Sequence, residues 1–148
     1  MTPTRDSDNG QTPKYFDVLI GAVWRRFSNL LSRSFETINI DSRSYAVMAL
    51  VDAEQLNQLA IAQRLKINKN VMVQLIDNLE KQGLCRRVQR PATRRREYYI
   101  QLTEEGKRKL KASTRLVAQA QEEVLKSLSD QEKNTLLRIL RKLTKNGY

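Results

Sequence analysis

The chain has 148 residues and a net charge of +11, with 40% hydrophobic and 29% charged residues, an ordinary composition for one globular domain. One cysteine and no histidine exclude a disulfide framework and leave little for a zinc site. They also exclude the usual Ser-His and Cys-His nucleophile pairs, and the five glycines form no phosphate-binding loop. We therefore expect neither an enzyme nor a cofactor.

The positive charge is concentrated in one part of the chain. Residues 56–96 carry ten Lys/Arg and two Asp/Glu, whereas residues 1–55 carry six and seven. Such a concentration is typical of a polyanion-binding surface, and a merely solubilising basic surface is the alternative. The chain shows no signal-peptide pattern and no apolar run long enough to span a bilayer, so we expect a cytoplasmic protein without a membrane partner.

The first part of the chain predicts a tail followed by two helices. Residues 1–13 are polar, without apolar periodicity, and we expect them to be disordered. A helix is predicted over about residues 14–35, where large apolar residues form a wide stripe. Asp41 can cap a second helix over about residues 42–51. That helix would turn inward Tyr45, Met48 and Ala49.

The next stretch predicts two short helices joined by a tight turn. Asn57 is a favourable N-cap for the first, whose apolar residues recur at helical spacing. These residues are Leu56, Leu59, Ala60 and Leu65. Ile67 would fill the turn, and Asn68 would cap the second helix. The inward face of the second helix would consist of Met72, Leu75, Ile76 and Leu79.

The second helix has a clear stop. Gly83 can adopt the left-handed conformation that ends a helix, and Leu84 would then pack on Leu79. Two short helices joined in this way form a helix-turn-helix, whose second helix usually enters the major groove of DNA.

A basic hairpin is predicted directly after this motif. Residues 85–89 and 97–102 have the pattern of two strands, with Pro91 ending the first. Six arginines and no acid occur over residues 86–96. A basic hairpin beside a helix-turn-helix is a winged helix, so the predicted fold class is mainly α with a small β wing.

Two more helices are predicted after the hairpin. Thr103 can cap a long helix that extends to about Leu128. Ser129 and Glu132 then form a capping box, Ser-x-x-Glu, at the start of the last helix. Its apolar stripe consists of Leu136, Leu137, Leu140 and Leu143. The stripes of the terminal helices need cover, which an intramolecular bundle or a second copy of the chain could provide.

Residues 56–106 resemble the winged helix-turn-helix of the MarR family of bacterial transcription regulators. The matching pieces are LAIAQRLKINKN, VMVQLIDNLEKQGL and YYIQLTEEGK. The flanks also fit the layout of that family. The resemblance implies a single domain over residues 14–148, in which dimerisation helices at 14–38 and 104–148 flank a winged helix-turn-helix at 41–103. It further implies a homodimer in which the first and last helices of two chains interlock.

Three positions depart from the family pattern. The turn usually carries a glycine where this chain has Lys66, and the recognition helix often begins with aspartate where this chain has Asn68. The wing often has Asp-x-Arg where this chain has Arg94-Arg95-Arg96. These departures leave the fold intact but remove the acid-to-arginine anchoring that is usual for the wing of this family.

The polar face of the second motif helix carries the candidate DNA-reading residues. They are Lys69, Asn70, Val71, Val73, Gln74 and Asn78. Asparagine and glutamine can pair bidentately with adenine, and valine can contact the thymine methyl group, so we expect an A·T-rich site. Lys69 is expected to contact phosphate near the helix N-terminus. An ordinary solvated helix face is the alternative.

Arginines of the wing are the second group of candidates. Arg94, Arg95 and Arg96 are expected to reach the minor groove or the flanking phosphates. Arg86, Arg87 and Arg90 are weaker candidates because they lie lower on the hairpin. A solvated basic turn is the alternative.

The remaining candidates concern a ligand and the cysteine. The resemblance implies that a small aromatic acid binds between the dimerisation helices and the winged helix. Trp24, Phe27 and Tyr45 would line that site, with Arg25 or Arg43 as the counter-charge. Core aromatics and surface arginines without a ligand are the alternative. Cys85 is expected to be a small buried strand residue.

These observations together predict a bacterial, cytoplasmic transcription regulator that binds double-stranded DNA as a homodimer. Its site would be a pseudo-palindrome with half-sites about 34–36 Å apart, and a small aromatic ligand would release it. Two other classes remain open. One is a nucleoid-type architectural protein that binds by charge and DNA shape, and the other is a protein-interaction module that uses the winged fold.

Overall fold

The computed structural model describes residues 14–91 and 97–144. Its elements, in chain order, are α1 (Phe16–Glu36), α2 (Ser42–Ala53), α3 (Gln58–Arg64), α4 (Lys69–Lys81), β1 (Cys85–Gln89), β2 (Tyr98–Leu102), α5 (Glu104–Leu125) and α6 (Asp130–Thr144). The predicted fold class is therefore confirmed. The predicted disordered tail and the wing tip with Arg94, Arg95 and Arg96 lie outside the described residues.

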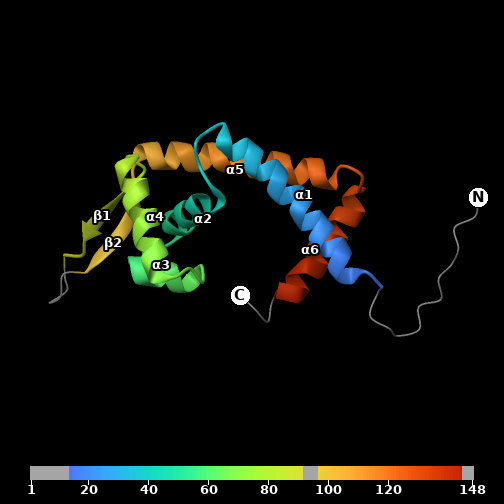
Figure 1. The fold of residues 1–148 in the computed structure, drawn as a ribbon, viewed down its shortest axis with the longest axis horizontal. Coiled ribbons are helices and arrows are strands. Elements are labelled where there is room, and N and C mark those ends of the chain that lie inside the picture. Colours follow the sequence, from blue (N-terminus) through green and yellow to red (C-terminus); the bar gives the residue numbers. More distant parts are fainter. Residues whose placement is uncertain (1–13, 92–96, 145–148) are drawn as a thin grey trace, which may run out of the picture.

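Figure 1 shows that the molecule has two structured ends, which the long helix α5 joins. At one end lie α2, α3, α4 and the β1–β2 hairpin, which together (residues 42–102) we call the reading head. The helix α5 runs from the reading head to the other end, where it lies beside α1. The last helix, α6, follows there. None of the described helices combines the length and the apolarity needed to cross a bilayer.

Five helices begin at capping residues that the sequence predicted: Asp41, Asn57, Asn68, Thr103 and Ser129. The Ser129 backbone N–H also donates to Glu132 Oε2 at 2.8 Å, which completes the capping box. Three predicted helix ends differ from the structure by two or three residues, and one of them is the end of the second helix, which lies at Ala53 rather than Val51. The first helix begins at Phe16 because Tyr15 has a left-handed φ of 69°. The fifth helix ends at Leu125 rather than Leu128, which belongs to the following turn.

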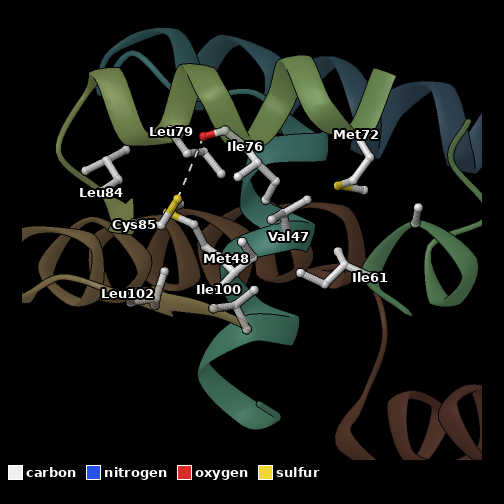
Figure 2. Packing of buried hydrophobic residues seen from close by; sticks show 12 residues of the cluster. Val47, Met48, Ile61, Met72, Ile76, Leu79, Leu84, Cys85, Ile100 and Leu102 are labelled. Atoms are coloured by element: carbon white, nitrogen blue, oxygen red, sulfur yellow. Dashed lines mark hydrogen bonds between the residues drawn. The ribbon is translucent and has the colours of Figure 1, made fainter. Parts of the chain in front are cut away.

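The core of the reading head lies under α4. Figure 2 shows Met72, Ile76 and Leu79 pointing from this helix toward α2 and β2, and all three are fully buried, as predicted. The predicted stop of α4 is also confirmed. Gly83 has a φ of 69°, and the Leu84 N–H donates to the Leu79 carbonyl at 2.9 Å.

The inward faces of α2 and α3 differ from the prediction. In α2, Val47 is fully buried beside Met48, whereas Ala49 is only half-buried. In α3, Ile61 and Ala62 are buried, whereas Leu59 is 58% exposed. The helical spacing from residue 56 was misleading because Leu56 precedes the helix. It lies in an extended connector, where its carbonyl accepts a hydrogen bond from the Ile100 N–H at 2.9 Å.

Much of the apolar surface outside the reading head is uncovered. A small second cluster buries Leu31 and Phe35 of α1 against Ala120 of α5. The beginning of α1 is different, because its large hydrophobic residues are 47–69% exposed. They are Phe16, Val18, Leu19, Ile20, Val23 and Trp24, with Tyr15 just before the helix. In α6 no residue is buried.

Candidate nucleic-acid interface

The face of α4 opposite the core presents polar side chains to solvent. Lys69, Asn70, Gln74 and Asn78 are exposed, and Val73 is 38% exposed. Val71 is half-buried at the edge of the face. Five of the six candidate reading residues thus lie together on a surface that other macromolecules can reach. We call α4 the recognition helix below.

The N-terminus of the recognition helix favours anions. The Asn68 side chain accepts from the Asn70 N–H at 2.8 Å, which fixes the first turn. That turn contains no acidic residue, and Lys69 is exposed there. A helix N-terminus with free N–H groups and a nearby lysine suits a phosphate oxygen.

The turn before the recognition helix holds a lysine in a conformation that favours glycine. Lys66 has a φ of 52°, the left-handed region. The Lys66 N–H donates to the Gln63 carbonyl at 3.2 Å, and the Ile67 N–H donates to the Ala62 carbonyl at 2.9 Å. The chain therefore keeps the tight turn geometry without the usual glycine.

Arg87, one of the weaker DNA-contact candidates, is bonded to other side chains of the protein. Its Nη2 donates to Asp77 Oδ1 at 2.7 Å and to Gln58 Oε1 at 2.9 Å, and its Nη1 pairs with Glu80 Oε2. Its backbone N–H donates to Glu80 Oε1 at 2.8 Å. We call Gln58, Asp77, Glu80 and Arg87 the Arg87 cluster. Sequence reasoning missed Asp77 and Glu80, although they are the only two acids in the basic stretch of residues 56–96.

The two other lower arginines are exposed but also bonded. Arg86 donates to Gln101 Oε1 across the hairpin, from Nε at 3.2 Å and from Nη2 at 2.9 Å. Arg90 Nη2 donates to the Gln55 carbonyl at 3.2 Å. The Arg90 N–H donates to the Glu97 carbonyl at 2.9 Å, which closes the hairpin at the base of the wing tip.

The candidate ligand residues lie mostly around the second apolar cluster. Phe27 and Tyr45 both pack against it, and the Tyr45 ring lies 5.5 Å from that of Phe35. Trp24 is 65% exposed, with its ring centroid 6.1 Å from that of Phe27. Arg25 and Arg43 are exposed. The three aromatics are thus near one cluster, with both arginines on the surface.

A cavity of about 510 Å³ lies elsewhere, between the end of α2 and the first turns of α5. Its lining consists of Asp52, Lys107, Leu110, Lys111, Thr114 and Arg115. No sequence pattern indicated this cavity, because its lining residues come from two helices that only the fold brings together.

Cys85 is buried, as predicted, with 4% of its surface exposed. Figure 2 shows its Sγ directed at the Ile76 carbonyl, 3.9 Å away. Burial, with a smaller contribution from the nearby Glu80 carboxylate, raises the pKa of the thiol from its ordinary value of 9.0 to about 11. The thiol is therefore neutral at physiological pH and poorly reactive. Among the described residues, no group of three or more His, Cys, Asp or Glu could hold a metal ion.

Comparison with known proteins identifies the fold and the function class that the sequence predicted. The MarR family model matches residues 45–96. The transcriptional regulator HosA of Escherichia coli O111:H- is 30% identical over 109 residues, which span 73% of this chain and 80% of HosA. A MarR-family regulator from Rhodococcus sp. RHA1 superposes with a TM-score of 0.77 at 23% identity, over 93% of this chain and 99% of that one.

A further solved structure is that of the Mycobacterium tuberculosis MarR-family protein Rv2887 in complex with DNA. It has a TM-score of 0.76 and 19% identity, and the match covers 90% of this chain and 98% of that one. The same protein is also known in complex with salicylic acid. At these identities the structural matches establish the fold, and the HosA match establishes the family. The chain belongs to the MarR family of transcriptional regulators.

Proposed function

We propose that this regulator binds promoter DNA as a homodimer, reads its sequence with the recognition helix, and acts by blocking or displacing another protein. The observation that carries the proposal is that the polar face of α4 is exposed while the apolar residues of its opposite face, Met72, Ile76 and Leu79, are fully buried. The strong positive charge of residues 56–96 supports it, because that charge would attract the phosphate backbone. The DNA complex of Rv2887 supports the same use of the fold.

Base reading would rest on Asn70, Gln74 and Asn78, which are exposed and project from one side of the helix. Amide side chains pair best with adenine, and the exposed Val73 could contact a thymine methyl group. An A·T-rich half-site follows from these side chains. Lys69 would contact a phosphate at the helix N-terminus.

The wing would add contacts beside the major-groove site. Arg94, Arg95 and Arg96 follow β1 and precede β2 in the sequence, and arginine suits a narrow, A·T-rich minor groove. Arg86 and Arg90 are exposed and could reach phosphates from the lower hairpin. Arg87 is a poorer candidate, since three side chains already accept its N–H groups.

A second copy of the chain would cover the apolar residues that α1 and α6 expose. Monomeric proteins rarely leave so many large hydrophobic side chains exposed to water on two helices. Pairing through α1 and α6 would leave the two reading heads free to bind DNA. A two-fold symmetric dimer would then bind two half-sites about 34–36 Å apart.

A small aromatic acid is the proposed effector, in keeping with the salicylic acid complex of Rv2887. The site would include Trp24, Phe27 and Tyr45, with Arg25 or Arg43 as counter-charge. Binding beside α1 and α2 would change the spacing of the two reading heads and so release the DNA.

Selection of binding sites from a random DNA pool tests the proposal. We expect the selected sequences to share an inverted, A·T-rich repeat with half-sites about one helical turn apart. Gln74→Ala should weaken the selected site by roughly 1–3 kcal/mol and relax preference at one position. Lys126→Ala, which removes a cation just after α5, at the opposite end of that helix from the reading head, is the control and should bind normally.

Two other outcomes would contradict the proposal. Strong binding without any enriched sequence would indicate an architectural DNA-binding protein. Failure to retain any DNA would indicate a protein-interaction module.

A further inference from the structure

We propose that Arg87 is a positioning residue for DNA reading. Its guanidinium would hold the recognition helix at a defined orientation to the wing and would neutralise Asp77, a carboxylate on the DNA-facing side of that helix. The inference rests on the proposed DNA binding and concerns a residue that touches no DNA itself.

The first support is the place of the Arg87 cluster in the fold. Arg87 lies on β1, Gln58 is the first residue of α3, and Asp77 and Glu80 lie on α4. One side chain therefore joins the wing to both helices of the helix-turn-helix. The bonds are direct, at 2.7 Å to Asp77 and 2.9 Å to Gln58, with Glu80 held by both the side chain and the backbone N–H.

The second support is the position of Asp77 on the recognition helix. It follows Asn70 and Gln74 by seven and three residues, a spacing that puts all three on one side of a helix. The Asp77 side chain is 47% exposed. A bare carboxylate there would repel the phosphates that flank a major-groove contact, and the Arg87 guanidinium removes that penalty.

The third support is the geometry of arginine. A guanidinium is planar and offers several N–H donors in fixed directions, so it can bond three acceptors at once. Lysine keeps the charge but acts as a single point on a flexible stem, and it cannot hold Gln58, Asp77 and Glu80 together. Arg87→Lys therefore separates the positioning role from the charge.

The experiment measures affinity for a selected duplex and for a scrambled duplex at two salt concentrations, with every variant at a temperature where it is folded. For Arg87→Lys we expect the ratio of the two affinities to fall by about tenfold or more, with the salt slope unchanged. The matched control is Arg64→Lys. Arg64 ends α3 and pairs with Glu54 at 2.6 Å, and the change to lysine keeps its charge, so the ratio should stay at the wild-type value.

A second pair of variants tests the neutralisation of Asp77. Arg87→Gln should weaken binding to both duplexes severalfold, because it leaves the Asp77 charge unpaired. Adding Asp77→Asn should restore most of the lost affinity for scrambled DNA, because no bare carboxylate then remains. Loss of helix orientation alone would not be repaired in this way.

Three results would overturn the inference. If Arg87→Gln lowers the salt slope by about 0.9 and Asp77→Asn repairs nothing, Arg87 contacts a phosphate directly. If the Arg87 variants melt earlier but bind both duplexes like wild type when folded, the cluster serves stability alone. If Arg64→Lys lowers the ratio as much as Arg87→Lys, the effect is not specific to the cluster. Wild-type protein that binds neither duplex would instead refute the proposed function.

Discussion

Gly106→Ala offers a sharp test of how the reading head is joined to α5. Gly106 is buried in the first turn of α5, next to the residues that end the recognition helix. A Cβ atom there would lie 1.9 Å from the Leu84 carbonyl oxygen and 2.9 Å from its carbonyl carbon. The same junction is tied by Thr103, whose N–H donates to the Leu84 carbonyl at 3.1 Å and whose Oγ1 donates to the Gly83 carbonyl at 2.5 Å.

The expected cost follows from that distance. Real Cβ atoms do not approach other heavy atoms closer than 3.0 Å, so Leu84 and α5 must separate by about 1.1 Å. Both contacting atoms belong to the backbone, and no side chain can rotate away to relieve the clash. Overpacking commonly costs about 1–3 kcal/mol, and we expect the upper end, about 3 kcal/mol. For a chain of this length that lowers the Tm by roughly 6–12 °C.

Thermal unfolding followed by circular dichroism at one fixed protein concentration measures the effect. Gly83→Ala is the matched control, because its Cβ would meet nothing within 4 Å but its φ is 69°. Backbone strain alone should cost about 1–2 kcal/mol there. If Gly106→Ala were no less stable than Gly83→Ala, the close packing of α5 on Leu84 would be wrong.

Four other substitutions test separate parts of the account. Leu140→Arg should abolish the proposed homodimer in sedimentation experiments, because it puts a charge into an apolar interface. Asn134→Arg is the control and should leave the dimer intact. A dimer that survives Leu140→Arg would exclude α6 from the interface. The Lys66→Gly variant should be about 1 kcal/mol more stable than the Lys66→Ala variant, because only glycine adopts the left-handed φ of 52° without strain. Equal free energies of unfolding in urea would show that this position is not strained. Replacing Arg94, Arg95 and Arg96 with alanine should lower the salt slope of DNA binding by about 2–3, and an unchanged slope would remove the wing from the interface. The Cys85 thiol keeps its proton up to about pH 11 when folded but loses it near pH 9 when unfolded. Between those pH values the wild type should therefore lose about 2–3 kcal/mol of unfolding free energy relative to Cys85→Ala, and a constant difference would contradict the raised pKa.

Local signals in the sequence were sufficient for most of the fold. Capping side chains act over two or three residues, so Asp41, Asn57, Asn68 and Thr103 could be recognised without any tertiary knowledge. The same holds for Gly83, whose left-handed conformation ends α4. The inward face of α4 was predictable because thirteen residues give the helical period room to repeat.

Features that depend on contacts between distant segments could not be predicted. Leu59 fits the helical spacing when it is counted from Leu56. Leu56, however, lies before the helix in an extended connector that is hydrogen-bonded to β2, so this count indicated the wrong face, and Leu59 is exposed. Arg87 looked like any other arginine of a basic run. Its bonding partners are Gln58, 29 residues away, and two acids of α4, and only the folded reading head brings these groups together.

We propose that this regulator recognises a DNA sequence rather than charge alone. A titration of the wild-type protein with a selected duplex and a scrambled duplex of equal length, at physiological salt, distinguishes the two. We expect the selected duplex to bind about a thousandfold more tightly or better, with both affinities falling steeply as salt rises. A ratio near one would contradict it and show that the recognition helix does not discriminate between base sequences.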